Sequence, residues 1–279
     1  VTIPTSVTGI CAYAFYNCRG LGSVTIPEGV VRLGTEAFNN CWNLTELAIP
    51  GSMKQIDPRA FSDCRGLTEI TIPGSVTNVG VSAFSYCQGL ASVTVPACVL
   101  GTGLGSVFPG ASSITNVVLA EGVQSIPRSA FRSSGSFPKL EHVFIPGSVA
   151  TIDAEAFRAF RGKIAVTVDP ANAVYSSRDG MLLTKDGTTL LQGVNGDVTI
   201  PSGVTSIDAR AFDNCNGLTR VVIPNSVTNI GNFAFKACSN LDDVWMPKHL
   251  EGKLSANVFA NCGSATLNYY DALYVVTFR

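Results

Sequence analysis

The cysteines are the residues of this sequence best suited to chemistry, because thiols can form disulfides, bind metals or act as nucleophiles. The chain of 279 residues has nine of them, and seven follow a phenylalanine by three residues. This recurrence indicates a repeated unit, and in stacked repeats the equivalent side chains point the same way, roughly 5 Å apart. Side chains arranged in this way lack the converging Cβ vectors that a disulfide requires. We therefore predict a ladder of buried, free thiols at Cys18, Cys41, Cys64, Cys87, Cys215, Cys238 and Cys262.

Other chemistry finds little support in the sequence. Metal binding is not indicated, because no Cys-x-x-Cys pair occurs and His142 and His249 lie away from the ladder. Cys11 and Cys98 are the two remaining candidates for other thiol chemistry. No nucleophile elbow, phosphate loop or zinc signature is present. We expect a segment that is not an enzyme and uses no cofactor and no metal, while an enzyme domain elsewhere in a longer protein stays possible.

Composition narrows the class of protein further. Hydrophobic residues make up 46% of the chain and charged residues 14%, which excludes disorder. A net charge of −1 gives no reason to expect nucleic acid or an anionic membrane as a partner. No run of about 18 apolar residues is long enough to span a membrane. No signal peptide is visible, and we interpret the chain, which begins inside a repeat motif, as a fragment of a longer protein.

A repeat in the sequence determines where the cysteines and the other candidate residues lie in the fold. Ten phenylalanines recur at spacings of 23 or 24 residues, with two longer spacings of 26 and 55. Nine prolines and an alanine at position 120 keep the same period. The ten phenylalanines are Phe15, Phe38, Phe61, Phe84, Phe108, Phe131, Phe157, Phe212, Phe235 and Phe259.

One unit, residues 67–87 (LTEITIPGSVTNVGVSAFSYC), shows the local structure that we expect. The alternating segment 70–72 favours a strand, which Pro73 ends because it has no N–H for the ladder. Val76 and Val79 return inward, and Ala83-Phe84 is predicted in a short helical or 3₁₀ turn on the opposite side. One unit cannot bury its own apolar face, but stacked units can. The sequence therefore predicts a solenoid of about ten to eleven coils with a parallel sheet on one side.

The L-x-x-L-x-L strand with a period in the twenties resembles a leucine-rich repeat. The additional Ile-Pro, Ala-Phe and Cys-x-x-Leu motifs are similar to those of the BspA-like (Treponema-type) family of surface proteins. This resemblance implies an α/β leucine-rich-repeat solenoid over residues 1–279. We expect N-terminal coils in 1–168, an irregular coil with a β-hairpin insertion in 169–197, and C-terminal coils in 198–279. The sequence departs from the pattern at CVLGTGLGSVFPGASSI, at RSSGSFPKL and in the insertion between Phe157 and Phe212.

The insertion carries two Asp-Gly pairs, Asp179-Gly180 and Asp186-Gly187, around the apolar runs 181–184 and 188–192. Asp-Gly between β-prone runs predicts a hairpin, because glycine adopts positive φ without strain. The alternative is that its Asp and Asn residues bind calcium, but the EF-hand spacing is absent. We expect a β-hairpin flap.

The outward face of the predicted sheet is the expected ligand surface. Side chains alternate across a strand, so the residues between the inward ones should align into two columns on the concave face. Solenoids commonly bind partners there. Phe144 and Trp245 are the candidate anchors, although isolated exposed apolar residues are also ordinary. The candidate binding residues are Val118, His142, Phe144, Arg220, Val222, Asp243 and Trp245.

Two functions remain open at this point. The resemblance implies an extracellular or cell-surface module that binds a host or bacterial surface protein, an extracellular-matrix protein or a glycan, and points to adhesion. The alternative is a structural spacer that projects another domain from the cell. An array with a distinct tip domain in the full-length protein would favour the spacer.

Overall fold

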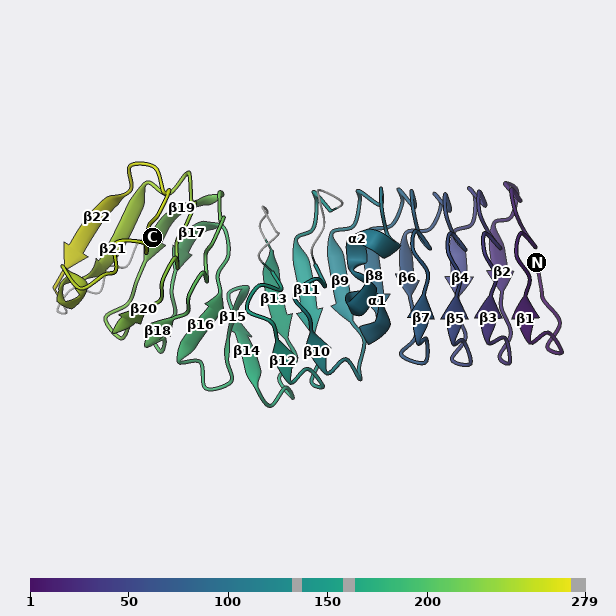
Figure 1. The fold of residues 1–279 in the computed structure, drawn as a ribbon, viewed down its shortest axis with the longest axis horizontal. Coiled ribbons are helices and arrows are strands. Elements are labelled where there is room, and N and C mark those ends of the chain that lie inside the picture. Colours follow the sequence, from purple (N-terminus) through teal and green to yellow (C-terminus); the bar gives the residue numbers. More distant parts are fainter. Residues whose placement is uncertain (132–136, 158–163, 272–279) are drawn as a thin grey trace. The chain divides into compact units, whose positions relative to one another are not determined.

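The computed structural model describes residues 1–131, 137–157 and 164–271. It is a parallel-sheet β-solenoid of about 11 turns with few helices (Figure 1), which confirms the predicted fold class. The chain divides into two compact units, Val1–Ala159 and Phe160–Arg279, called here the N unit and the C unit. That residues 1–279 form one continuous solenoid stays a prediction.

The first sheet of the N unit consists of the predicted V-x-I strands. Their alternation is as expected: Ile70 is 3% exposed, whereas Glu69 and Thr71 on either side are exposed. Parallel pairing joins β2 to β4, and β6, β8, β9 and β11 in that order. The strands are β2 (Ser23–Thr25), β4 (Glu46–Ala48), β6 (Glu69–Thr71), β8 (Ser92–Val95), β9 (Asn116–Leu119) and β11 (His142–Ile145).

A second sheet, which was not predicted from the sequence, forms where the chain of each repeat turns back toward the core. Its strands are two residues long, with one residue facing outward and one facing the core. Such short strands carry too little alternation to be recognised in a sequence. They are β1 (Gly9–Ile10), β3 (Arg32–Leu33), β5 (Gln55–Ile56) and β7 (Asn78–Val79), followed by β10 (Ser125–Ile126) paired with β12 (Thr151–Ile152).

The Ala-Phe segments form turns rather than the predicted short helices. The Tyr16 N–H donates to the Tyr13 carbonyl within its own turn at 3.0 Å. The N–H groups on either side of it donate to carbonyls of the following coil: Phe15 N to Ala37 O and Asn17 N to Asn39 O, each at 2.7 Å. Residues with a left-handed backbone conformation, such as Tyr13 (φ 61°) and Asn17 (φ 60°), make successive N–H groups point alternately into their own turn and toward the next coil. Half of the turn N–H groups therefore hold neighbouring coils together, which a helix would not allow.

Helices do occur in the coil of the N unit where the sequence CVLGTGLGSVFPGASSI departs from the repeat pattern. α1 (Ala97–Thr102) and α2 (Leu104–Val107) replace the short strand there. α1 packs between β7 and β10 and so interrupts the second sheet (Figure 1). The Cys98 thiol donates to the Val76 carbonyl at 3.2 Å, which ties α1 to the preceding coil.

The C unit repeats the two-sheet plan with an antiparallel beginning. Its first sheet has the order β17 (Gly196–Thr199), β19 (Leu218–Val222), β21 (Asp243–Pro247) and β22 (Thr266–Tyr270). Its second sheet has the order β14 (Tyr175–Arg178), β15 (Met181–Thr184), β16 (Thr189–Gln192), β18 (Ser206–Ile207) and β20 (Asn229–Ile230). β13 (Ala165–Val168) precedes these strands, and the 3₁₀ helix η1 (Lys248–Leu250) follows β21.

The predicted hairpin is present, but it is not a flap. β15 and β16 pair antiparallel, and β16 pairs in parallel with β18, so the insertion is part of the second sheet. Met181 and Leu183 lie in the core of the C unit. Asp186 acts as a turn residue: its Oδ1 accepts hydrogen bonds from Thr184 Oγ1 at 2.6 Å and from Thr188 N at 3.1 Å. These bonds, the Thr184 bond first, lower the pKa of the Asp186 carboxyl.

The repeat phenylalanines form continuous stacks in the core. In the N unit, Phe38 and Phe61 have ring centroids 5.3 Å apart, and Phe61 and Phe84 follow at 5.2 Å. In the C unit, Phe212 and Phe235 lie 4.8 Å apart. The rings are nearly parallel, with interplanar angles of 8°, 14° and 11° for these pairs. In the coils that contain it, the repeat phenylalanine therefore fills the space under the turn.

Candidate functional site on the first sheet

The two outward columns predicted on the first sheet are confirmed wherever its strands pair within a unit. In the N unit, Asn116 pairs with His142 and Val118 pairs with Phe144. In the C unit, Arg220 pairs with Asp243 and Val222 pairs with Trp245. The seven predicted residues thus form two groups, one of three residues in the N unit and one of four in the C unit.

The N-unit group has only three residues and is weakly polar. His142 is exposed, and Val118 and Phe144 are partly buried. The strands beside them carry short polar side chains, and Asn116 Nδ2 donates to Ser92 Oγ at 2.9 Å. This part of the face offers one aromatic side chain in otherwise small surroundings.

The C-unit group combines charge with an aromatic ring. Arg220 lies in register between Asp197 and Asp243, and its Cζ is 6.0 Å from the centre of the Trp245 ring. Arg220, Asp243 and Trp245 are all partly buried. A guanidinium flanked by two carboxylates and next to an indole can offer both donors and acceptors to one ligand, with the ring supplying apolar contact.

The last strand of this face, β22, was not predicted from the sequence. β22 extends both columns, because Thr266 pairs with Asp243 and Asn268 pairs with Trp245. Asn268 Nδ2 donates to Asp243 Oδ1 at 3.4 Å, and the Tyr270 hydroxyl donates to the Ile223 carbonyl at 2.5 Å. This segment lacks the proline that marks the other strands. Its signal was the spacing, since 266 and 268 lie 23 residues after 243 and 245.

The ladder cysteines are free, as predicted, and five of the six buried sulfurs donate to the carbonyl of a repeat phenylalanine in the preceding coil. Cys64 Sγ donates to the Phe38 carbonyl at 3.2 Å and Cys87 Sγ to the Phe61 carbonyl at 3.1 Å. Burial raises the pKa of the Cys87 thiol to about 12 and that of the Cys215 thiol to about 12. Buried, protonated thiols of this kind are poor nucleophiles and poor metal ligands.

One ladder prediction is wrong. Cys18 is exposed rather than buried, because its coil is the first that the structure describes and its outer side is uncovered. Cys11, which lies off the ladder, is also exposed. Within the described part of the chain, no three His, Cys, Asp or Glu side chains gather in a way that could hold a metal ion.

Comparison with protein-family models matches residues 1–103, 101–164 and 194–277 to the BspA-type leucine-rich repeat region, in six copies. Comparison with curated proteins finds no match. The described residues contain no helix with the length and apolar character needed to cross a membrane.

Several solved bacterial structures are similar to the chain. A leucine-rich cell surface protein from Faecalibacterium prausnitzii is 26% identical, with a TM-score of 0.39, over 96% of this chain and 78% of that one. The pneumococcal vaccine antigen PcpA is 20% identical, with a TM-score of 0.46, over 98% and 72%. A leucine-rich repeat protein from Bacteroides ovatus is 21% identical, with a TM-score of 0.39, over 96% and 83%.

The family match covers nearly all coils of both units and includes the strand, proline, Ala-Phe and cysteine positions that form the core. The chain belongs to the BspA-type leucine-rich repeat family.

Proposed function

We propose that this chain is a non-catalytic, extracellular or cell-surface module that binds a partner through the outward face of its first sheet, chiefly in the C unit. Leucine-rich repeats generally mediate protein binding, and the Faecalibacterium protein is described as a cell surface protein. The role that we infer is adhesion to a host or neighbouring-cell molecule.

The observation that carries this proposal is the side-chain content of the C-unit columns. Tryptophan, tyrosine and arginine are the residues that most often dominate binding energy at protein interfaces. Arg220, Trp245 and Tyr270 lie on neighbouring strands of this face. Their partly buried positions fix their orientation, which reduces the entropy that a ligand must remove on binding.

The test measures binding of the chain to an immobilised extracellular-matrix extract. Trp245→Ala should weaken binding by about tenfold or more, the usual effect of a hot-spot truncation. Tyr86→Ala is the matched control, because it removes an exposed aromatic ring from the turn side of the N unit. Equal binding by the two variants would contradict the proposed surface.

Enzymatic treatment of the extract then identifies the chemical class of the partner. We expect protease treatment to abolish binding and glycosidase treatment to leave it intact. Loss of binding only after glycosidase treatment would identify a glycan partner on the same face. Phe144→Ala should weaken binding by less than Trp245→Ala, because the Trp245 ring has the Arg220 guanidinium beside it, whereas the strand partner of Phe144 is the apolar Val118.

A further inference from the structure

Three planar side chains stack on one another in the first three coils of the N unit. Arg19, Trp42 and Arg65 occupy equivalent positions, each directly after a ladder cysteine. The Arg19 Cζ lies 4.1 Å from the centre of the Trp42 ring, and the Arg65 Cζ lies 4.7 Å from it. Because the Trp42 coil lies between the other two, a guanidinium covers each face of the indole. Each contact is a cation–π interaction.

Each of these three side chains is oriented by the residue two positions before it. Asn17 Oδ1 accepts from Arg19 Nε at 2.9 Å, and Asn40 Oδ1 accepts from Trp42 Nε1 at 3.2 Å. Asp63 Oδ1 accepts from Arg65 Nε at 3.0 Å and Nη2 at 2.8 Å. The three acceptor residues share a left-handed backbone, with φ of 60°, 61° and 59°. The planes are therefore held in place before any ligand arrives.

The charges around this stack leave one cation without a carboxylate. Asp63 pairs with Arg65 at 2.8 Å, Glu36 with Arg59 at 3.5 Å and Asp57 with Arg32 at 2.7 Å. Among the described residues, no carboxylate lies within ion-pair distance of Arg19, whose single side-chain hydrogen bond is that from Nε to Asn17. Its two terminal nitrogens remain open to a ligand. A fixed guanidinium edge of this kind matches a carboxylate, which it can bind through two parallel bonds.

Two exposed aromatic rings lie in the same coil as this open cation. Tyr13 and Tyr16, six and three residues before Arg19 in the chain, are 56% and 47% exposed. Their rings meet edge to face, with centroids 5.8 Å apart. Tyrosine, tryptophan and arginine are enriched at protein interfaces, where lysine and glutamate are depleted. This surface, called here the Arg-Trp-Arg surface, consists of Tyr13, Tyr16, Arg19, Trp42 and Arg65.

We propose that the Arg-Trp-Arg surface docks an acidic segment of a partner protein. One Asp or Glu carboxylate of that segment binds the terminal nitrogens of Arg19, and its neighbours pack on Tyr13 and Tyr16. A sugar ring would need an open indole face for stacking, and both faces of Trp42 are covered. This inference goes beyond the proposed function, because none of these residues lies on the outward face of the first sheet.

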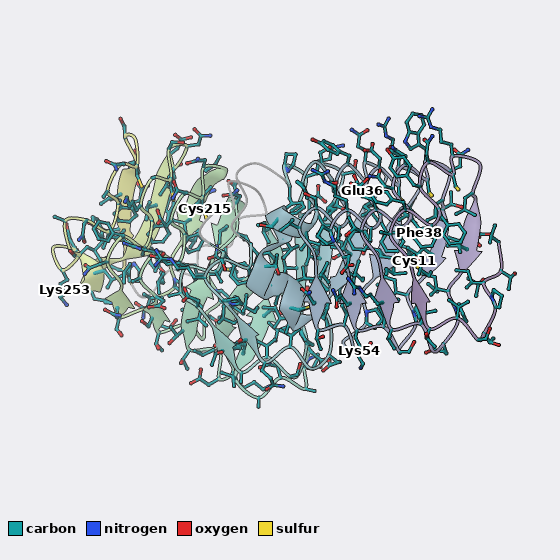
Figure 2. All side chains as sticks on the ribbon, turned by 45° about the vertical axis from the view of Figure 1, so that its right-hand side comes forward. Cys11, Glu36, Phe38, Lys54, Cys215 and Lys253 are labelled. Carbon is teal, nitrogen blue, oxygen red and sulfur yellow. The ribbon has the colours of Figure 1, made fainter. Side chains whose placement is uncertain are left out.

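The test uses the full chain and an immobilised copolymer of glutamate and tyrosine as the probe. Arg19→Gln should weaken binding by about tenfold, a loss of about 1.4 kcal/mol. Arg19→Lys keeps the charge but loses the planar fork, so it should also bind more weakly than the unsubstituted chain. Lys54→Gln is the matched control: it removes an exposed cation on the side of the N unit away from Glu36 (Figure 2). Its affinity should stay within about twofold.

Three results would overturn the proposal. The first is the absence of binding to the copolymer, and the second is an equal loss in Arg19→Gln and Lys54→Gln, which would indicate nonspecific charge attraction. The third comes from a parallel measurement on immobilised heparin. If Arg19→Gln weakens binding to heparin alone, the surface binds a sulfated glycan and not an acidic protein segment.

Discussion

The N unit and the C unit are built on the same repeat but interrupt it in different ways. In the N unit, α1 takes the place of a strand in the second sheet, and the phenylalanine stack continues past it to Phe108. In the C unit, three antiparallel segments form the start of the second sheet, and the stack of described rings begins at Phe212. Both interruptions keep an apolar core, although Gly193 takes the phenylalanine position of the inserted coil, where the Phe212 ring lies against it. The repeat therefore tolerates changes of backbone as long as each coil fills its part of the core.

The outward positions differ more than the inward ones. The first sheet of the N unit displays Phe144 among mainly polar side chains, and the stacked Arg19, Trp42 and Arg65 lie outside that sheet. In the C unit the arginine and the tryptophan lie on the first sheet itself. Since outward residues carry no packing constraint, they can vary between coils without cost to the fold. The two units therefore have the same pattern of core residues, each within itself, and differ in the side chains that face outward.

The largest expected effect is the loss of a stacked phenylalanine. Phe61 is fully buried between Phe38 and Phe84, so Phe61→Ala should lower the free energy of unfolding by about 3–5 kcal/mol. In a repeat protein this loss should be local, and hydrogen exchange should rise in the turns of the N unit but not in the C unit. Phe235→Ala is the mirror control, with the rise confined to the C unit. A uniform rise in both units would show that they unfold as one body.

A smaller effect is expected where the C unit replaces a phenylalanine by glycine. Gly193 N donates to Ala211 O at 2.8 Å, as Phe15 N donates to Ala37 O, so Gly193 occupies the phenylalanine position of its coil. A Cβ there would lie 2.0 Å from Phe212 Cε1. Gly193→Ala should therefore lower the unfolding free energy by about 1–3 kcal/mol through overpacking.

The matched control for this change is Gly203→Ala, where a Cβ would meet no atom within 4 Å. Chemical denaturation of both variants measures the difference, and Gly203→Ala should stay within about 0.5 kcal/mol of the parent. Similar losses at both glycines would mean that backbone freedom, and not the Phe212 ring, explains the result.

The third prediction concerns pH and the thiol ladder. Burial raises the pKa of Cys87 to about 12, above the 9.0 of an exposed thiol. Between these values the unfolded chain has lost this proton and the folded chain keeps it. The unfolding free energy therefore falls as pH rises above about 9, by about 1.4 kcal/mol per pH unit for each such thiol. Its contribution is fully present below that pH.

Denaturation midpoints of the parent chain and of Cys87→Ala, measured at about pH 8.5 and about pH 10.5, test this slope. The variant should start less stable and lose less between the two pH values. Identical slopes in the parent and in Cys87→Ala would contradict a titrating buried thiol at this position.

The sequence predicted those features that recur at the repeat period in most coils. The phenylalanine stack, the thiols and both outward columns follow from the period, because equivalent positions in a solenoid share one environment. It did not predict the second sheet, whose two-residue strands such as Gln55–Ile56 are held mainly by pairing between coils. Nor did it predict β22, which lacks the proline mark, or the contacts of Trp42, which depend on side chains from three coils.

The candidate site was predictable to a similar degree. The register that places Arg220 beside Asp243 and Val222 beside Trp245 came from alternation and spacing alone. The contribution of Asn268 and Tyr270 required the structure, because it depends on how the last strand pairs. The exposure of Cys18 also required it, since burial in a solenoid comes from the neighbouring coil and not from the residue itself.

The most direct test of the account compares two adjacent residues on β21. Val244 is fully buried and Trp245 faces outward. Val244→Ala should lower the unfolding free energy by about 2 kcal/mol and leave the affinity of the folded chain for the extracellular-matrix extract unchanged. Trp245→Ala should stay within about 1 kcal/mol of the parent stability and lose about tenfold or more in affinity. If Trp245→Ala instead unfolds the chain, or binds as tightly as the parent, the separation between a constant core and a functional outward face is contradicted.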